Sequence, residues 1–323
     1  MAQEVGGELF VRHHTNPILT SKVWPYPINT VFNPGAIKFK DKILLLCRCE
    51  DKRGISHLTI AKSKDGITDW EIDTNPFIAP EPDTHPEELW GVEDPRITYM
   101  EELGKFAITY VSFSRGGPLV SLALTEDFEK LEKIGPIVPP EDKDSALFPR
   151  RINGEFLLIH RPSTTFQLGF HIWISSSPDL KHWGRHKILL LARQGAYWDA
   201  NKIGLGPPPL ETPEGWLILY HGVKQTASGA IYRVGLALLD LENPFQILHR
   251  SEGWVMTPQE YYEQSGDVGG VVFPTGWIYK PETDEIYLYY GAADTCICLA
   301  TAKLKDLLDY LKTCPPDTAP PWF

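Results

Sequence analysis

The sequence has few of the features that mark membrane, secreted or nucleic-acid-binding proteins. None of its apolar runs approaches the roughly 20 residues that cross a bilayer. The N-terminal region has no basic stretch followed by an apolar segment, which a signal peptide would need. Positive charge is in deficit, since 31 Lys and Arg face 42 Asp and Glu for a net charge of -11. That charge argues against nucleic acid or an anionic membrane surface as a partner.

Cysteine is also scarce, with five residues in 323. They fall as Cys47-x-Cys49, Cys296-x-Cys298 and the single Cys314. Residues i and i+2 of a strand face the same side, so each pair could offer two ligands to a metal ion. Structural zinc sites usually place at least two residues between such cysteines. We therefore predict buried, reduced cysteines, no bound metal and a cytoplasmic location.

Proline, glycine and aromatic residues are abundant instead, at 28 Pro, 26 Gly, 10 Trp, 13 Tyr and 14 Phe. This composition favours many short strands and turns, and a degenerate module recurs five times along the chain. In each copy the first strand is expected to open at a proline. These openings are Asn33-Pro34, Asp94-Pro95, Pro149-Arg150, Pro207-Pro208-Pro209 and Phe273-Pro274.

Each module continues with further short strands. The expected second strands are 43–49, 106–113, 156–161, 216–221 and 286–290, and the third strands are 58–61, 120–124, 170–174, 232–238 and 296–302. A fourth strand is expected at 75–78, 135–138, 188–191 and 254–258, but the fifth module continues into an amphipathic helix at about 303–312. Its missing strand is supplied by Asn16-Pro17-Ile18-Leu19 at the other end of the chain.

Four strands per module, at a period of roughly 55 to 65 residues, predict an all-β five-bladed β-propeller closed by an N-terminal strand, with a short C-terminal helix. We expect one domain, with the blades spanning about 20–302. A long β-sandwich or a β-helix is the alternative, and the proposed closure of the ring argues against both.

In a propeller, the first strands of the blades line a central channel, so residues at their ends meet although they are distant in sequence. Arg, Lys and His that converge on one place indicate a phosphate or other oxyanion site, and a carboxylate beside them can supply a proton. The residues expected at these positions are Asn33, Asp94, Arg150 and Lys202 from the first strands, with Arg48, Glu50, Arg161, His221 and Asp294 from the second.

These residues resemble glycoside hydrolase family 130. The matching motifs are Asn33-Pro34, Glu93-Asp94-Pro95-Arg96, the run from Phe148 to Gly154, Lys202-Ile203-Gly204, the run from Glu211 to Trp216, Tyr220-His221-Gly222 and the run from Tyr289 to Thr295. Members are five-bladed propellers, mostly inverting β-mannoside phosphorylases that release α-mannose 1-phosphate. The resemblance therefore implies phosphorolysis of short β-linked manno-oligosaccharides, with inorganic phosphate as co-substrate and no cofactor.

The resemblance also implies residue roles. Asp94 matches the general acid, whose proton passes through the 3-hydroxyl of the bound mannose. Arg150, Lys202 and His221 match the phosphate ligands, and Arg161 lies where it could assist. Asn33, Arg48 and Asp294 match mannose ligands, and Glu50 and Glu93 are expected beside the sugar. Glu93 and Pro34-Gly35 depart from the relatives, which carry Tyr and Ser-Ala at these places.

Two other functions are open from the sequence. An inverting β-mannosidase would need a second carboxylate as base, for which Glu87, Glu88 and Glu93 are available. A non-catalytic carbohydrate-binding or protein-interaction propeller would be favoured if Asp94 were paired with Arg96 and closed off from the channel. The two departures favour β-1,2-mannobiose over β-1,4-linked substrates, and analogy with the family favours a homo-oligomer.

Overall fold

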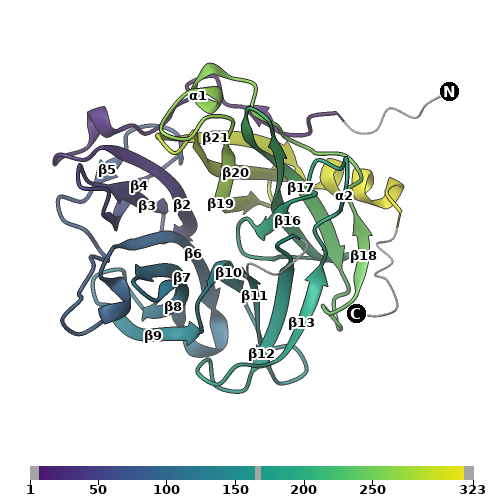
Figure 1. The fold of residues 1–323 in the computed structure, drawn as a ribbon, viewed down its shortest axis with the longest axis horizontal. Coiled ribbons are helices and arrows are strands. Elements are labelled where there is room, and N and C mark those ends of the chain that lie inside the picture. Colours follow the sequence, from purple (N-terminus) through teal and green to yellow (C-terminus); the bar gives the residue numbers. More distant parts are fainter. Residues whose placement is uncertain (1–6, 164–168, 316–323) are drawn as a thin grey trace.

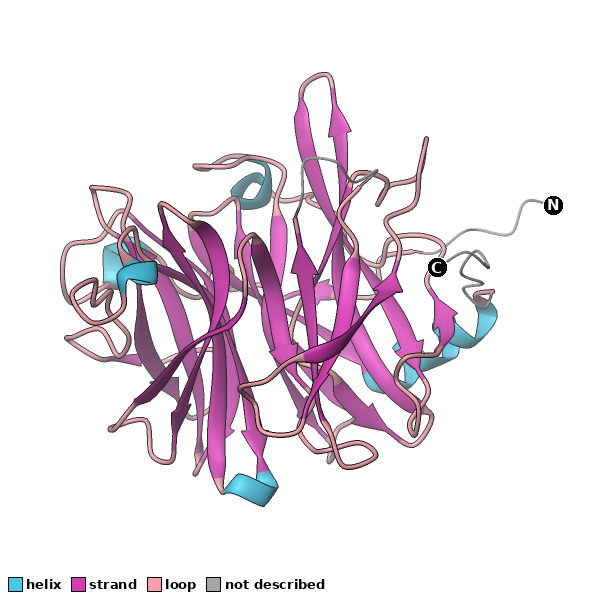
Figure 2. Ribbon diagram, turned by 60° about the horizontal axis from the view of Figure 1, so that its bottom comes forward, coloured by secondary structure: helices cyan, strands magenta, loops and turns pink. Residues whose placement is uncertain are grey.

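Five antiparallel sheets are arranged in a ring around a central axis in the computed structural model, which describes residues 7–163 and 169–315 (Figure 1). Strands run through the body of the molecule, and the short helices lie at its periphery (Figure 2). The five-bladed β-propeller predicted from the repeat is therefore confirmed, as is the C-terminal helix, α2 (Leu304–Thr313). No helix among the described residues is long and apolar enough to span a membrane.

The first three blades each contain four strands in sequence order. Blade one is β2 (Thr30–Phe39), β3 (Lys42–Glu50), β4 (Ser56–Ser63) and β5 (Glu71–Ile72). Blade two is β6 (Val92–Met100), β7 (Lys105–Ser114), β8 (Gly117–Thr125) and β9 (Glu132–Val138). Blade three is β10 (Asp142–Leu147), β11 (Phe156–Pro162), β12 (Ile172–Ser177) and β13 (Gly184–Leu190).

The last two blades depart from this arrangement of four strands in sequence order. Blade four is β14 (Lys202–Leu205), β16 (Gly215–Thr226), β17 (Gly229–Leu239) and β18 (Ile247–Arg250), with β15 (Leu210–Thr212) also pairing with β16. Blade five is β19 (Val272–Lys280), β20 (Glu285–Ala292) and β21 (Cys296–Lys303), and the N-terminal β1 (Val11–Arg12) is its outer strand. Short helices precede β2, β6 and β7, at Ser21–Val23, Pro86–Glu88 and Glu101–Leu103, and α1 (Tyr261–Gln264) precedes β19.

The N-terminal segment closes the ring, but its strand lies earlier than predicted. Val11 pairs with Thr301, whereas the predicted segment 16–19 contributes one isolated bridge, Leu19 to Ile297. Blades one and four follow the same rule, since their outer strands are β5 and β18 and the predicted segments supply the single bridges of Ile78 and Met256. Each of these three segments contains a proline, which cannot donate to a strand ladder, although the predicted segment 135–138 pairs within β9 despite Pro136.

The inner strands of the first three blades share one irregularity that aims side chains into the channel. In each, two residues stand opposite a single residue of the second strand, and the first of the two has a left-handed backbone. These first residues are Asn33 (φ 45°), Asp94 (φ 50°) and Asp144 (φ 52°). Asn and Asp tolerate this conformation better than other non-glycine residues. Such β-bulges redirect a side chain and are typical of strands beside active sites.

In two blades the proline does not mark the start of the first strand, contrary to the prediction from the sequence. The inner strand of blade three ends before Pro149, and that of blade four ends before Pro207. Lys202 is accordingly the first residue of β14, where the prediction put it just before the strand. In blades one and two the proline lies in the bulge, at Pro34 and Pro95, and in blade five Pro274 directly precedes a bulge.

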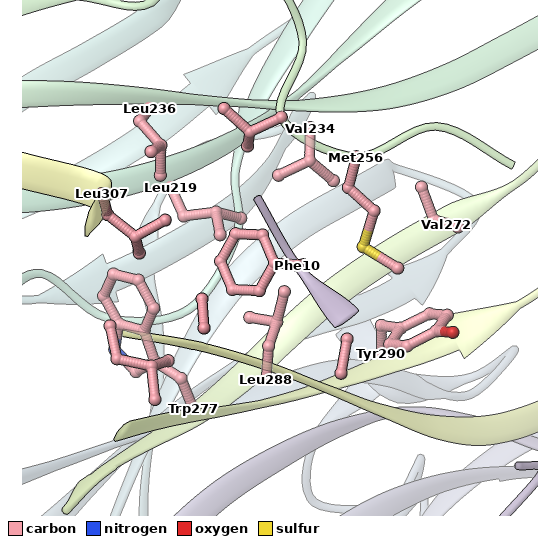
Figure 3. Packing of buried hydrophobic residues seen from close by; sticks show 14 of the residues in the cluster. Phe10, Leu219, Val234, Leu236, Met256, Val272, Trp277, Leu288, Tyr290 and Leu307 are labelled. Carbon is pink, nitrogen blue, oxygen red and sulfur yellow. The ribbon is translucent and has the colours of Figure 1, made fainter. Parts of the chain in front are cut away.

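The hydrophobic core lies between neighbouring blades. In the cluster between blades four and five, Phe10 is 2% exposed and is surrounded by Leu219, Leu236, Trp277 and Leu288 (Figure 3). Burying a phenylalanine side chain contributes about 1.5–3 kcal/mol, so the segment before β1 is fixed by packing as well as by pairing. All five cysteines are buried, as predicted, and none forms a disulfide.

Candidate active site

A cavity of about 170 Å³ lies at the end of the channel where the inner strands begin, and all five blades contribute to its lining. Its polar lining residues come from β2, β3, β6, β10, β11, β14, β16, β17 and the turn after β20. They are Asn33, Arg48, Asp94, Lys143, Asp144, Arg161, Lys202, His221, Tyr232 and Asp294. Phe273, Val268 and Val271 supply the apolar part.

Asp94 is the centre of what we call the acid half of the cavity, which comprises Asn33, Arg48, Asp94 and Asp294. One carboxylate oxygen, Oδ1, accepts hydrogen bonds from Asn33 Nδ2 at 2.9 Å and from Arg48 Nη1 at 3.0 Å. Arg48 is itself fixed, since its Nε donates to Ser56 Oγ at 2.9 Å and its guanidinium lies 4.6 Å from the ring centre of Phe32. Asp94 is therefore held in one orientation by two side chains of blade one.

The two carboxyls of the acid half differ in acidity. Burial alone would raise the pKa of Asp94, but Arg48, Arg96 and Lys143 outweigh it and hold that pKa below its usual value. Burial, together with the nearby charges of Asp94, Glu50 and Glu93, raises the pKa of Asp294 to about 6, although Arg48 opposes the shift. Asp94 is thus ionised at neutral pH, whereas the pKa of Asp294 lies just below neutral pH.

Glu93 and Glu50 stand behind the acid half rather than in the cavity lining. Glu93 bridges Arg48 Nη2 at 3.1 Å and Lys143 Nζ at 3.2 Å, and Glu50 Oε2 lies 3.8 Å from Arg48 Nη2. Burial raises the pKa of Glu50 despite that arginine. Both residues lie next to the predicted site, but they contact Arg48 and do not line the cavity. Their placement therefore supports a role in holding Arg48 rather than a direct contact with a sugar.

The opposite wall forms the cationic half, which comprises Asp144, Arg161, Lys202 and His221. Arg161 Nε donates to Asp144 Oδ2 at 2.7 Å and its Nη1 donates to Ser163 Oγ at 2.6 Å. Lys202 Nζ donates to the Tyr232 hydroxyl at 2.7 Å. His221 Nε2 lies 3.5 Å from Asp144 Oδ2, and its ring is 4.6 Å from that of Phe273. Three of the four predicted phosphate ligands therefore meet on one wall.

Burial makes Lys202 and His221 weaker bases than usual. It lowers the pKa of Lys202 to about 8, and the neighbouring charges of Arg161 and Lys143 act in the same direction. Burial also lowers the pKa of His221 to about 3. The charge of Asp144 opposes this shift, whereas Arg161 and Lys202 add to it. His221 is therefore a neutral hydrogen-bonding group at physiological pH rather than a cation, and the positive charge of this wall resides on Arg161 and Lys202.

Arg96 is buried beneath the cavity as a structural residue. Its Nε and Nη2 donate to the carbonyls of Gly206 and Leu205 in blade four, at 3.0 and 2.8 Å, and its Nη1 donates to the carbonyl of Asp94 at 3.0 Å. It thus ties blade two to blade four through backbone oxygens. The Asp94 carboxylate stays open to the cavity, so the condition that favoured a non-catalytic propeller is not met.

Arg150 does not belong to this site, so its assignment as a phosphate ligand is wrong on geometry. It follows β10, at the opposite end of that strand from Asp144. There it forms an ion pair with Glu211, Nη2 to Oε1 at 2.8 Å, with the side chains 41% and 40% exposed. Both line a separate cavity at the other end of the inner strands, beside Tyr99, Pro149 and Trp277.

Sequence reasoning missed Asp144, Lys143 and Tyr232. A spacing signal could have found Asp144, because Asn33 precedes Arg48 by 15 residues and Asp144 precedes Arg161 by 17. In both blades the arginine stands opposite the residue before the bulge, Phe32 in one and Lys143 in the other. Blade three simply lacks the proline that follows the bulged residue in blades one and two. Among residues 7–163 and 169–315 no cluster of His, Cys, Asp or Glu could hold a metal ion.

Comparison with known proteins places this geometry in a family. The sequence profile of glycoside hydrolase family 130, described as beta-1,4-mannooligosaccharide phosphorylase, matches residues 11–313. The chain is 34% identical to a beta-1,4-mannooligosaccharide phosphorylase of Ruminococcus albus over 309 residues, which cover 94% of this chain and 90% of that protein. It is 39% identical to a beta-1,2-mannobiose phosphorylase of Listeria innocua over 258 residues, which cover 80% and 69%.

A solved structure agrees with the sequence comparisons. The beta-1,2-mannobiose phosphorylase of Listeria innocua, in complex with beta-1,2-mannobiose, superposes with a TM-score of 0.86 and 31% identity. The superposition covers 94% of this chain and 99% of that one. The resemblance noted in the sequence motifs is therefore confirmed, and the chain belongs to glycoside hydrolase family 130.

Proposed function

We propose that this chain is an inverting β-mannoside phosphorylase. It cleaves the β-mannosidic bond of a short manno-oligosaccharide with inorganic phosphate and releases α-mannose 1-phosphate, without a cofactor. The relatives support the reaction class, since they are named as phosphorylases of β-1,4-linked and β-1,2-linked mannosides. The proposal for this chain also has a basis in its own residues.

The observation that carries the proposal is the division of one cavity into an acid half and a cationic half. Phosphorolysis needs a single proton donor for the leaving oxygen and a site that holds phosphate on the opposite face of the sugar. Asp94 is suited to the first task. Arg161 and Lys202, with His221 and the Tyr232 hydroxyl, are suited to the second, because charged donors bind oxyanions strongly.

Asp94 can act as an acid only if the bound substrates raise its pKa. The protein alone keeps it ionised, because Arg48, Arg96 and Lys143 hold its pKa below the usual value. A bound phosphate dianion would counter these cations, and a bound mannose would displace water, and both effects raise the pKa of a carboxyl group. We infer that Asp94 takes up its proton as the two substrates bind, and then passes it to the leaving oxygen.

Hydrolysis by the same cavity is less well supported, because the carboxylates that could serve as base are engaged elsewhere. Glu88 is fully buried and is bonded to Lys133 Nζ at 2.7 Å and to the Tyr110 hydroxyl at 2.9 Å. Glu93 bridges Arg48 and Lys143. Asp144 lies in the cavity, but burial and the charge of Arg161 leave its pKa well below the usual range, so it would accept a proton from water poorly.

The glycosidic linkage is the open part of the proposal, and we favour β-1,2-mannobiose over β-1,4-linked substrates. Incubating the protein with α-mannose 1-phosphate and a panel of acceptors tests it: mannose, glucose and N-acetylglucosamine, with the product linkage assigned by NMR. We expect a disaccharide and released phosphate with mannose as acceptor. If α-mannose 1-phosphate stays unconverted with every acceptor while β-mannobiose is cleaved, a hydrolase is supported instead. The cytoplasmic location and the homo-oligomer stay predictions.

A further inference from the structure

The cationic half contains one carboxylate, Asp144, at the place where an anion is proposed to bind. Asp144 is 2% exposed and lines the cavity beside Arg161, Lys202 and His221. Arg161 holds its pKa well below the usual range against the effect of burial, so it is ionised throughout the neutral pH range. A fixed negative charge in an anion site weakens the binding of any anion that cannot donate a hydrogen bond to it.

The two oxygens of Asp144 are used differently. Oδ2 accepts the hydrogen bond from Arg161 Nε at 2.7 Å and lies 3.5 Å from His221 Nε2. Oδ1 accepts no hydrogen bond from residues 7–163 or 169–315, and its nearest cation is Arg96 Nη2 at 3.6 Å. An ionised carboxylate can only accept hydrogen bonds, and the long contact with Arg96 leaves Oδ1 with acceptor capacity for a ligand.

The fold is built to keep Asp144 in this position. The left-handed backbone of the β10 bulge turns its side chain into the channel. Gly204 of β14 makes room for it, because a β-carbon there would clash with Asp144 Oδ2 and with a ring carbon of His221. No larger residue could occupy position 204 without displacing both side chains.

We propose that Asp144 Oδ1 accepts a hydrogen bond from the P–OH group of inorganic phosphate and so selects phosphate against oxyanions that carry no proton, such as sulfate. This inference rests on the proposed function, since it assigns a role within the phosphate site. At neutral pH phosphate always carries at least one O–H group, whereas sulfate carries none. Sulfate would set an unprotonated oxygen against a buried carboxylate, and buried polar groups left unpaired discriminate strongly between similar ligands.

The same contact orients the nucleophile. With the P–OH oxygen turned toward Asp144, an unprotonated phosphate oxygen is available to face the anomeric carbon of the mannose. That oxygen forms the new bond to the anomeric carbon as the bond to the leaving sugar breaks. The proton of Asp94 goes to the leaving oxygen, and the P–OH proton remains on the mannose 1-phosphate product.

Calorimetric titration of phosphate, arsenate and sulfate into the full-length protein tests the inference directly. Arsenate carries a proton as phosphate does, so wild type should bind these two alike and sulfate at least about tenfold more weakly. In Asp144→Asn the side-chain amide can donate to an unprotonated oxygen, so sulfate should come within about threefold of phosphate. The matched control is Asp142→Asn. Asp142 is also buried on β10 but does not line the cavity, since it bonds His160 and the backbone N–H of Arg161. Asparagine keeps an acceptor for that N–H, so the anion preference should stay that of wild type.

Two results would overturn the role of Asp144: equal affinity of wild type for phosphate and sulfate, or an Asp144→Asn variant that keeps the full preference for phosphate. If that variant does not fold, the relative affinities of wild type for phosphate, arsenate and sulfate still test the proposed selection of protonated anions. Failure of the proposed function is seen separately, as cleavage of β-mannobiose at an unchanged rate without phosphate, and it needs no variant.

Discussion

The acid half and the cationic half of the cavity are built in the same way but tuned in opposite directions. Each takes its central carboxylate from a β-bulge, Asp94 in β6 and Asp144 in β10, and each carboxylate accepts a hydrogen bond from an arginine of a second strand. Around Asp94 stand an amide and the further carboxyl of Asp294, whereas around Asp144 stand Lys202 and a neutral His221. One repeated device thus supplies the proposed acid on one side and the proposed anion site on the other.

The largest expected effect comes from removing the acid. Asp94→Asn keeps the volume of the side chain but cannot deliver a proton, so turnover of β-mannobiose should fall by roughly 10²- to 10⁴-fold. Steady-state kinetics measure the loss, and circular dichroism checks that the fold is retained. If the folded variant retains more than about a tenth of wild-type turnover, another group is the acid.

A smaller but selective effect is expected from the other half. Arg161→Ala removes a charged donor of the proposed phosphate site, and losing one such preorganised donor typically costs about 10²- to 10³-fold in turnover. The Michaelis constant for phosphate should rise, while that for the sugar should move much less. Equal changes in both constants would show that the two halves do not divide the substrates as proposed.

The pH dependence of phosphate use should report Lys202. Its pKa is lowered to about 8, so the side chain is charged below that pH and loses its proton as the pH rises through it. The kcat/KM for phosphate, which reflects groups of the free enzyme, should therefore decline above about pH 8. In Lys202→Arg the guanidinium stays charged and the decline should move to higher pH. A decline at the same pH in both proteins would assign the titration to another group.

The smallest effect is expected at the far end of the channel. Arg150→Ala breaks an ion pair that is 41% and 40% exposed, and such pairs contribute about 0–1 kcal/mol to stability. Because Arg150 does not line the cavity, the Michaelis constant for phosphate should stay within about twofold of wild type. This variant is the matched control for Arg161→Ala. A large rise in that constant would mean that Arg150 reaches the phosphate after all.

Most of the fold could be predicted because its signals are local. The fivefold recurrence of short strands and turns fixes the number of blades, and the absence of a fourth strand after residue 303 points to closure by the N-terminus. The exact outer strands could not be predicted, since of the proline-containing segments 135–138 lies in β9 whereas 75–78 forms only a single bridge, and their local sequences do not tell them apart.

Among the bulged residues of the site, those followed by proline were predicted and the one without it was not. Asn33 and Asp94 stand before Pro34 and Pro95, whereas Asp144 stands before a serine and was missed. Arg150 was placed in the site because Pro149 was interpreted as the start of a strand that in fact ends before it. The neutrality of His221 follows from burial and from cations of two other blades, which no local pattern encodes.

The most direct test of the account is the phosphate dependence of wild-type cleavage. The purified protein is incubated with β-1,2-mannobiose, with and without inorganic phosphate, and the products are followed by ³¹P and ¹H NMR. We predict cleavage only with phosphate, and a mannose 1-phosphate of α configuration, because phosphate attacks the face opposite the leaving oxygen. Free mannose formed at the same rate without phosphate would contradict the account and make the cavity that of a hydrolase.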